Sequence, residues 1–286
     1  MNDIFKYSED GKTLLSIKDK KVKEVVIPNG VVFIGRCVFR DCSSLLSIDI
    51  PNSVTSIKEE AFLNCSLLQS IKIPNNVTSI GSFAFCGCTS LQEIEIPNSV
   101  TSIGDNAFRS CYSLQSVKIS NGITSIKRET FLNCSSLQVI DIPNSVIQIG
   151  FLAFCGCSSL KNVNIPNSVT LIAPVAFGGC SSLERIKIPN NVSFIGMDTF
   201  NGCTSLQKIE IPNSVISIDD RAFAHCSSLK EITINNQEIE KVKFGCCFND
   251  IDFNNCILYI PSGTRWAYRH HPIFGKFKNI ATEKSD

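Results

Sequence analysis

The sequence lacks the features that mark several large classes of protein. No apolar run approaches the roughly 20 residues that a membrane-spanning helix needs, so we expect no insertion into a membrane. The 27 basic and 26 acidic side chains leave a formal charge of only +1, with no polybasic run. The electrostatic footprint of a nucleic-acid-binding protein is therefore missing, and we expect no nucleic-acid partner. The first ten residues also lack the basic and apolar regions of a secretory signal.

Groups that carry out chemistry are equally scarce. The sequence has three histidines, and two of them are adjacent. Adjacent side chains point apart on regular structure, so His270 and His271 do not make a metal site without further ligands. The isolated His225 is expected to lie on the surface. The sequence shows no glycine-rich phosphate loop, nucleophile elbow or pair of catalytic carboxylates, so we expect no enzyme activity, no cofactor and no metal.

What the sequence does contain is a unit of 23 residues, repeated nine times without an insertion. Phenylalanine recurs at this step, at Phe39, Phe62, Phe85, Phe108, Phe131, Phe154, Phe177, Phe200 and Phe223. Cysteine recurs in the same way, at Cys42, Cys65, Cys88, Cys111, Cys134, Cys157, Cys180, Cys203 and Cys226. A fixed period of this length predicts a repeat solenoid, in which each unit packs only on its neighbours.

Each repeat has a pattern that predicts local structure. Val117 and Ile119 lie two residues apart, the spacing of one face of a strand, so Ser116 and Lys118 are expected to face outward. The proline that follows most of these strands ends them, because proline cannot donate a ladder hydrogen bond. Residues 105–111 are expected to form one or two helical turns, with the repeated phenylalanine and cysteine on the inner face.

The period breaks at both ends of the chain, which predicts three parts. Residues 1–26 are expected to form an N-terminal hairpin cap with a two-residue type I′ turn at Asp10-Gly11. Nine 23-residue leucine-rich repeats fill residues 27–234. Residues 235–286 are expected to hold an irregular last repeat, a final strand at 256–261 and an aromatic C-terminal cap that covers the last ladder phenylalanine. The last five residues are expected to fray.

Fifteen cysteines raise the question of disulfides or bound metal, and their spacing argues against both. Repeated cysteines on neighbouring units would lie about one strand spacing, roughly 4.8 Å, apart and would point the same way. A disulfide instead needs Cβ atoms roughly 3.8 Å apart with a specific torsion. The Cys-Gly-Cys sequences at 86–88 and 155–157 have the wrong spacing for a zinc knuckle. We therefore expect reduced cysteines that fill the core as small hydrophobes.

The unit Leu-x-x-Ile-x-Ile-Pro-x-x-Val-x-x-Ile-Gly-x-x-Ala-Phe-x-x-Cys-x-x-Leu, found from residue 22 to about 234, resembles the BspA-like (Treponema pallidum-type) bacterial leucine-rich repeats. The resemblance implies a right-handed, curved β-solenoid with a parallel sheet on one face and short helical turns. It also implies protein-protein or host-surface binding without catalysis. Such proteins are often displayed on the cell surface or secreted, whereas the first residues carry no secretory signal, so a surface and a cytoplasmic location both stay open.

Two columns of outward-facing strand residues form the candidate interaction face. They contain Glu95, Lys118, Asp141, Asn164, Arg185, Lys187, Lys208, Glu210 and Glu231. Opposite charges alternate along the first five members of the column that contains Lys118, and each such pair stabilises by a few tenths to about 1 kcal/mol. This column can therefore be a self-satisfied, solubilising surface. The column that contains Arg185 is less regular, and irregularity on a regular scaffold is where specificity for a partner could be encoded.

Three functions stay open on these residues. The first is a non-catalytic protein-protein interaction scaffold, adhesin-like, that binds a host or matrix protein. The second is a structural or self-associating element without a host ligand, present as a monomer or a weak self-associate. The third is a glycan-binding module, which would need aromatic platforms in a cleft. Aromatic residues outside the ladder fall at differing repeat positions and do not build one; these are Phe33, Phe83, Tyr112, Phe151 and Phe194.

Overall fold

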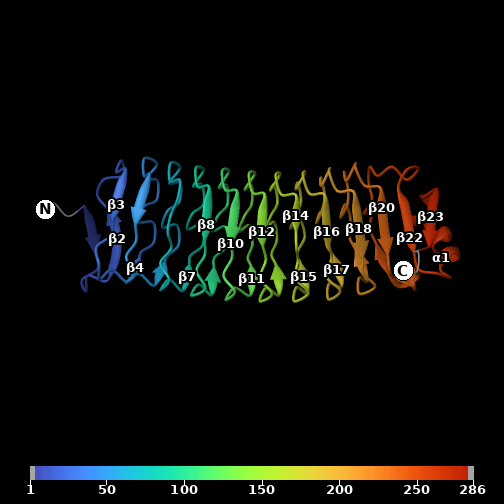
Figure 1. The fold of residues 1–286 in the computed structure, drawn as a ribbon, viewed down its shortest axis with the longest axis horizontal. Helices are drawn as coiled ribbons and strands as arrows, with labels where there is room; N and C mark the ends of the chain where they lie inside the picture. The colour runs from blue at the N-terminus through green and yellow to red at the C-terminus, as the bar shows by residue number, and fades with distance from the viewer. Residues whose placement is uncertain (1–3, 283–286) are drawn as a thin grey trace.

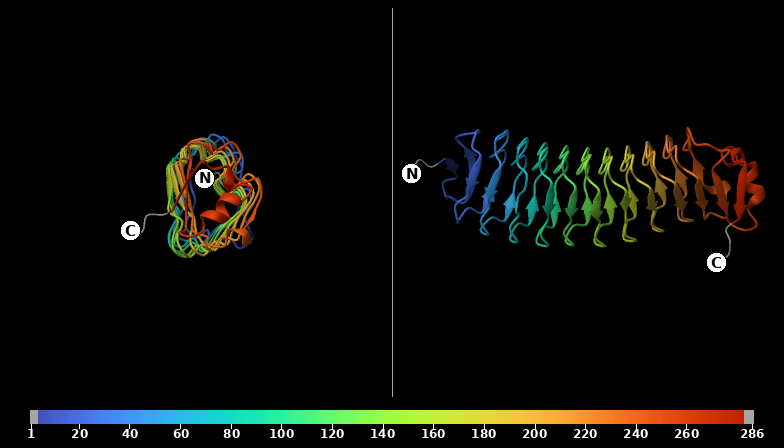
Figure 2. Two further views of the ribbon diagram at one scale, coloured as in Figure 1. Left: turned by 90° about the vertical axis from the view of Figure 1, so that its right-hand side faces the viewer. Right: turned by 45° about the horizontal axis from the view of Figure 1, so that its top comes forward.

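The computed structural model describes residues 4–282, which form one elongated stack of coiled rungs (Figure 1). The stack is a parallel β-solenoid of about 12 turns with little helix. Viewed along the long axis, successive rungs superpose as one closed outline, and α1 lies within that outline at the C-terminal end (Figure 2). The leucine-rich-repeat solenoid predicted from the 23-residue period is therefore confirmed.

The strands line two sides of the coil and form six hydrogen-bonded sheets in the described range. The strands of one side are together called the front sheet, and those of the other side the back sheet. The front sheet contains β3 (Glu24–Val26), β5 (Ser47–Asp49), β8 (Glu93–Glu95), β10 (Ser116–Lys118), β12 (Val139–Asp141), β14 (Asn162–Val163), β16 (Arg185–Lys187), β18 (Lys208–Ile211), β20 (Glu231–Ile234), β22 (Ile257–Ile260) and β23 (Asn279–Thr282). The back sheet contains β2 (Thr13–Ile17), β4 (Phe33–Ile34), β6 (Ser56–Ile57), β7 (Ser79–Ile80), β9 (Ser102–Ile103), β11 (Ser125–Ile126), β13 (Gln148–Ile149), β15 (Leu171–Ile172), β17 (Phe194–Ile195), β19 (Ser217–Ile218) and β21 (Lys243–Phe244). Before them comes β1 (Phe5–Tyr7), and the helices are η1 (Ile239–Lys241), α1 (Arg265–His270) and η2 (Phe274–Lys276). None of the helices in the described range 4–282 is long and apolar enough to cross a membrane.

The 23-residue step of the sequence is also the register of the sheets. In the front sheet, Lys118 lies directly beside Glu95 on one side and Asp141 on the other. Val117 is buried between the exposed Ser116 and Lys118, as the period of two predicts. Identical register on every rung means that each column of the sequence becomes a row of neighbouring side chains along the molecule.

The repeated phenylalanine rings form a continuous stack inside the coil. From Phe39 to Phe223, neighbouring ring centroids lie 5.1–5.7 Å apart and the rings are within 12° of parallel. Phe248 extends the stack at 5.4 Å, although it follows Phe223 by 25 residues instead of 23. The sequence predicted an irregular last repeat in this part of the chain, but not that Phe248 joins the stack, because the longer loop moves Phe248 out of the period.

The repeated cysteines lie beside this stack and are all reduced and buried. The Sγ atom of Cys65 donates to the backbone carbonyl of Phe39 at 3.1 Å, and the same contact recurs on each rung up to Cys226, at 3.1–3.4 Å. The expectation that the repeated cysteines are reduced and fill the core is confirmed. Eight of their thiols also add a second hydrogen bond to a phenylalanine carbonyl that already accepts a backbone amide of its own turn.

The helical turns expected at residues 105–111 are wrong. This segment is a pair of hydrogen-bonded turns, with Asn106 at φ 59° and Ser110 at φ 58°. Left-handed residues at this spacing interrupt any α-helix. Their amides instead bond across to the next rung, as from the N–H of Asn106 to the carbonyl of Arg128 at 2.9 Å. Inter-rung pairing therefore replaces intrahelical pairing in this part of the coil.

At the N-terminal end, β1 and β2 form an antiparallel hairpin, but its turn is not the two-residue type I′ turn expected. The amide of Ser8 donates to the carbonyl of Thr13 at 2.9 Å, which leaves a longer loop. Within that loop Gly11 has φ +70°, whereas Asp10 does not have the positive φ that a type I′ turn requires. The Asp10 carboxylate instead accepts from the amide of Lys12 at 3.1 Å and folds the loop around its side chain.

At the C-terminal end, β22 is not the final strand as expected. The chain continues through α1 and η2 and returns as β23, which pairs parallel to β22. Phe274 and Phe277 lie against Phe248 at 6.1 and 6.4 Å, with their edges or tilted faces toward the end of the ring stack. Of the five residues expected to fray, Thr282 ends β23, and residues 283–286 lie outside the described range.

Candidate interaction face and cap pocket

The front sheet brings the predicted interaction residues into two rows. One row runs through Glu95, Lys118 and Asp141, and a single bridge joins Asp141 to Asn164 in the next rung. Further along, the same row holds Lys187 directly beside Glu210. The other row places Arg185, Lys208 and Glu231 side by side. The structure therefore places all nine residues on one face, spread along the stack and not gathered at one point.

Two ion pairs neutralise part of this face. Lys118 Nζ lies 2.6 Å from Glu95 Oε1, and Lys208 Nζ lies 2.8 Å from Glu231 Oε2. All four of these strand residues are partly or largely exposed, so each pair contributes only about 0–1 kcal/mol to stability. In the column that contains Lys118, only Lys118 and Glu95 form an ion pair in the described range, although the sequence alternates charges along five members.

Arg185 and Lys187 differ from these pairs. Both side chains are exposed on β16, and neither has an ion pair among residues 4–282. Arg185 also lies directly beside Lys208, so two like charges are neighbours across the sheet. Directly opposed like charges are unfavourable. The two cations of β16 therefore form no ion pair in the described part of the chain, although Glu210 lies beside Lys187 on the next strand.

A groove of about 1030 Å³ lies on the front sheet over β8, β10 and β12. Its lining includes Glu95, Lys118 and Asp141, together with the exposed Val139. The remaining predicted residues lie outside this groove. A protein surface could therefore contact the front sheet at two places, one of mixed charge and one positive.

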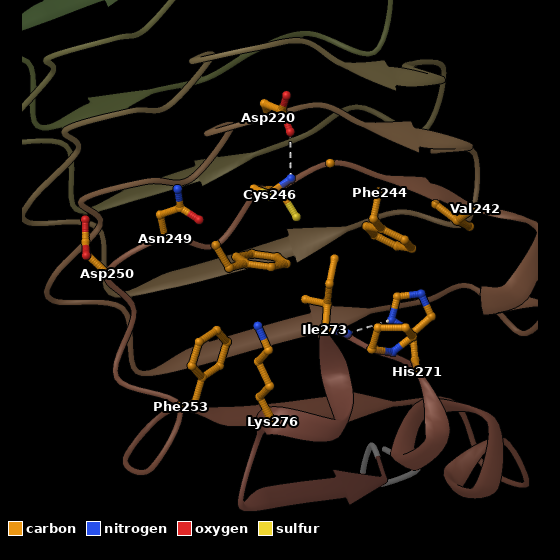
Figure 3. Close-up of a pocket in the computed structure, with 14 residues that line it drawn as sticks. Asp220, Val242, Phe244, Cys246, Asn249, Asp250, Phe253, His271, Ile273 and Lys276 are labelled. Atoms are coloured by element: carbon orange, nitrogen blue, oxygen red, sulfur yellow. Dashed lines mark hydrogen bonds between the residues drawn. The ribbon is translucent and has the colours of Figure 1, made fainter.

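A second hollow lies where the tenth rung, which contains Phe248, meets the C-terminal cap (Figure 3). This cap pocket has a volume of about 720 Å³, and Phe244, Phe253 and Ile273 give it apolar walls. Lys276 points into it, with Nζ 5.9 Å from the centre of the Phe253 ring. Asp220 Oδ1 accepts a hydrogen bond from the amide of Cys246 at 2.7 Å on the opposite side.

The cap pocket was not located from the sequence, because the pocket forms around the longer tenth rung, which departs from the repeat. The only signals were Cys246 and the aromatic residues outside the repeat frame. Its carboxylates already have partners: Asp220 holds the Cys246 amide, and Asp250 Oδ2 lies 2.9 Å from Nδ1 of His225. No group of three His, Cys, Asp or Glu side chains within the described range 4–282 could hold a metal ion.

The histidines lie as expected from the sequence. His225 is exposed on the surface next to Asp250. The adjacent pair turns to different partners: Nδ1 of His270 contacts the carbonyl of Trp266 at 2.8 Å, whereas the ring of His271 lies 5.1 Å from that of Phe244. Burial lowers the pKa of His271, which favours its neutral form.

The aromatic residues outside the ladder need one correction. Phe33 and Phe194 were expected at differing repeat positions, but each is the first residue of a back-sheet strand, so they share one position. They stand seven rungs apart, or roughly 34 Å at 4.8 Å per rung, too far to contact one sugar ring together. The correction leaves the glycan-binding interpretation without a platform at this position.

A family model described as BspA type leucine-rich repeat region matches residues 16–138, 60–183 and 124–256, which together span most of the chain. The chain belongs to the BspA-type leucine-rich repeat family. This family is typically non-catalytic, in keeping with the missing catalytic groups of the sequence. Comparison of this BspA-type chain with curated protein sequences gives no match.

Solved bacterial structures are similar to this BspA-type chain. A leucine-rich repeat protein of T. pallidum is 26% identical over 57% of this chain and 90% of its own, with a TM-score of 0.49. One from Bacteroides ovatus is 28% identical over 93% of this chain and 85% of its own, with a TM-score of 0.46. A leucine-rich cell surface protein from Faecalibacterium prausnitzii is 24% identical over 100% of this chain and 94% of its own, with a TM-score of 0.41.

Proposed function

We propose that this BspA-type repeat protein is a non-catalytic scaffold that binds an acidic surface of a host or extracellular-matrix protein through its front sheet. The observation that carries this proposal is the pair of exposed cations on β16, Arg185 and Lys187, which have no ion pair among the described residues. Complementary charge on a partner would remove the repulsion between Arg185 and Lys208 and would speed encounter.

The rigidity of the solenoid favours binding at this site. Each rung is held to the next by two sheets, a ring stack and thiol-to-carbonyl hydrogen bonds, so the front-sheet side chains lie on a pre-formed surface. A pre-organised surface loses little conformational entropy when a partner binds. The proposal places the protein at the cell surface or outside the cell, where such partners occur.

The test is a binding screen of the purified chain against extracellular-matrix and host-surface proteins, by biolayer interferometry. We expect Arg185→Glu with Lys187→Glu to weaken binding about tenfold or more, which corresponds to about 1.4 kcal/mol. A matched variant, Lys18→Glu with Lys58→Glu, makes the same change of charge at exposed sites away from the front sheet and should bind like wild type. No binding by wild type, or equal loss in both variants, would overturn the proposal.

A further inference from the structure

A strip of exposed apolar side chains crosses the back sheet and the turn that follows it. This apolar strip consists of the exposed Ile147, Phe151, Leu171, Met197 and Ile216, together with the half-buried Pro174. Ile147 and Ile216 are 51% and 61% exposed, and Met197 is 44% exposed. The preceding repeats have threonine, serine, aspartate and arginine at the corresponding positions, so the strip is a departure from the repeat and not part of it. Exposed apolar patches on a soluble surface mark interaction sites.

Backbone hydrogen bonds show that the middle of the strip is one continuous row. The amide of Glu129 donates to the carbonyl of Phe151 at 2.9 Å, and that of Val175 donates to the carbonyl of Met197 at 3.0 Å. Between them, the amide of Leu152 reaches the carbonyl of Pro174. Phe151, Pro174 and Met197 therefore occupy the same place on three consecutive rungs.

Opposite charges stand at the two ends of this row. On the rung before Phe151, the row position is held by Arg128 and the residue before it is Lys127. On the rung after Met197, the row position is held by Asp220 and the residue before it is Asp219. Pro174 lies midway, two rungs from each charged end. The row therefore reads basic, apolar, apolar, apolar and acidic along the stack.

Some of these charges already have contacts inside the chain. Arg128 Nε lies 2.9 Å from Glu129 Oε1, and its guanidinium stands 5.4 Å from the centre of the Phe151 ring. Asp220 holds the Cys246 amide through one oxygen. Next to it, the Arg221 guanidinium pairs with Asp198 at 2.7 Å and contacts Met197 Sδ at 3.8 Å. Lys127 and Asp219 have no ion pair among residues 4–282, so their charges are the least satisfied of the four.

The row from Arg128 to Asp220 is complementary to itself. Consider a two-fold axis that passes beside Pro174, lies in the plane of the interface and is perpendicular to the row. It brings the basic end of one copy opposite the acidic end of the other and leaves the apolar centres facing each other. Beside the row, by contrast, Ile147 and Ile216 would face Ser193 and Thr124 of the other copy. A second copy related by that axis would place its Asp219 and Asp220 opposite Lys127 and Arg128, and the reverse. Most homodimers use an isologous interface of this kind, in which the same patch serves on both subunits.

We propose that the apolar strip is the interface of a homodimer in which two solenoids pack antiparallel about a two-fold axis at Pro174. The dimer uses the back sheet, so it leaves both front sheets open. Dimerisation adds to the proposed function and rests on it only for its consequence. A particle with two front sheets would bind a repetitive surface more tightly than one front sheet, by avidity.

The test measures the oligomeric state of the full chain by sedimentation equilibrium from about 1 µM to about 200 µM, a range that covers weak interfaces of small area. We expect a monomer–dimer equilibrium for wild type. Lys127→Asp alone and Asp219→Lys alone should each weaken the dimer about tenfold, because like charges then face each other. The double variant should recover wild-type association, because the exchange restores both opposite pairs.

Lys58→Asp is the matched control, since Lys58 occupies the same repeat position as Lys127 but lies outside the strip. It should dimerise like wild type. Circular dichroism and the melting temperature of every variant exclude loss of folding as the cause. A wild-type chain that stays monomeric over the whole range would overturn the proposal. So would a double variant that associates no better than the single variants, which would point to a different partner on this surface.

Discussion

The side chain of cysteine serves two purposes at its position in each repeat. It is small enough to fill the core beside the phenylalanine stack, and its thiol donates to an inward-pointing carbonyl, as Cys134 does to Phe108 at 3.1 Å. Alanine would lose the donor and would also leave the volume of the sulfur atom unfilled. The sequence predicted the burial from spacing alone, but not the hydrogen bond, because the direction of the Phe108 carbonyl depends on left-handed turns that no periodicity encodes.

These thiols make the stability of the fold sensitive to alkaline pH. Burial raises the pKa of all nine repeated cysteines, and those of Cys134 and Cys226 reach about 12. An unfolded thiol titrates near pH 8.5, so below that pH both states are protonated and the stability is fully present. Above it the unfolded state loses protons first, and each thiol lowers the free energy of unfolding by about 1.4 kcal/mol per pH unit.

Urea unfolding under reducing conditions, at about pH 8 and about pH 10, measures this loss. Cys134→Ser is the informative variant, because serine can keep the hydrogen bond to Phe108 but does not ionise in this range. Its stability should fall less steeply with pH than that of wild type, by the contribution of one thiol. An identical pH dependence in the two proteins would contradict the assignment of the effect to buried thiols.

At the level of the elements, the sequence predicted the strands better than the turns. Alternating apolar residues and a terminal proline located β12 and most of its neighbours, because the period of two follows from strand geometry alone. The turns at residues 105–111 resembled a helix, since phenylalanine and cysteine three apart fit a helical face as well as a tight coil. The left-handed φ of Asn106, set by pairing with the next rung, decides between them.

The ends of the solenoid close its ring stack with aromatic edges. Phe5 lies 6.4 Å from Phe39 at an interplanar angle of 89°, and Phe277 lies 6.4 Å from Phe248 at 87°. We propose on this basis that residues 1–26 and 235–286 act as caps for the nine repeats of 27–234. Terminal repeats of solenoids need such caps for solubility, because an uncovered rung exposes its core.

Substitutions within the C-terminal cap test this proposal. Phe274 is fully buried among the aromatic residues of the cap, so Phe274→Ala should lower the free energy of unfolding by about 3–5 kcal/mol. Trp266 belongs to the same cap but is 74% exposed, so Trp266→Ala should change stability by about 0.5 kcal/mol or less. Chemical denaturation compares the two. Equal effects would show that the ring contacts of the cap do not hold the end of the stack.

For the molecule as a whole, the candidate surfaces could be only partly read from the sequence. The outward-facing residues of the front sheet followed from the period of two along each strand and the 23-residue step between rungs. In the structure these residues lie side by side in rows. Which charges pair was not predictable, because Lys118 reaches Glu95 and not Asp141 through side-chain rotamers. The cap pocket depends on the tenth rung, whose loop has no counterpart in the repeats. The apolar strip was not among the surfaces predicted from the sequence, because its residues become neighbours only when consecutive rungs stack.

A solenoid held together by neighbour contacts alone should tolerate the loss of one complete rung. Deletion of Ser47–Gln69 removes 23 residues and joins Leu46 to Ser70, so every later row keeps its register and Lys72 comes to lie beside Val26. This chain should keep its circular dichroism and a single cooperative melt, with a melting temperature lowered by about 5 °C or less.

The matched control for this deletion removes half a rung. Without Ser47–Lys58 the remaining 11 residues of that rung cannot close one turn of the coil, and the phenylalanine and cysteine rows on either side are no longer joined. We expect a broad transition or none, because the stack is then divided into two shorter ones with uncovered ends. If both deletions melt alike, the rungs do not act as exchangeable units, and long-range contacts between the ends must stabilise the fold instead.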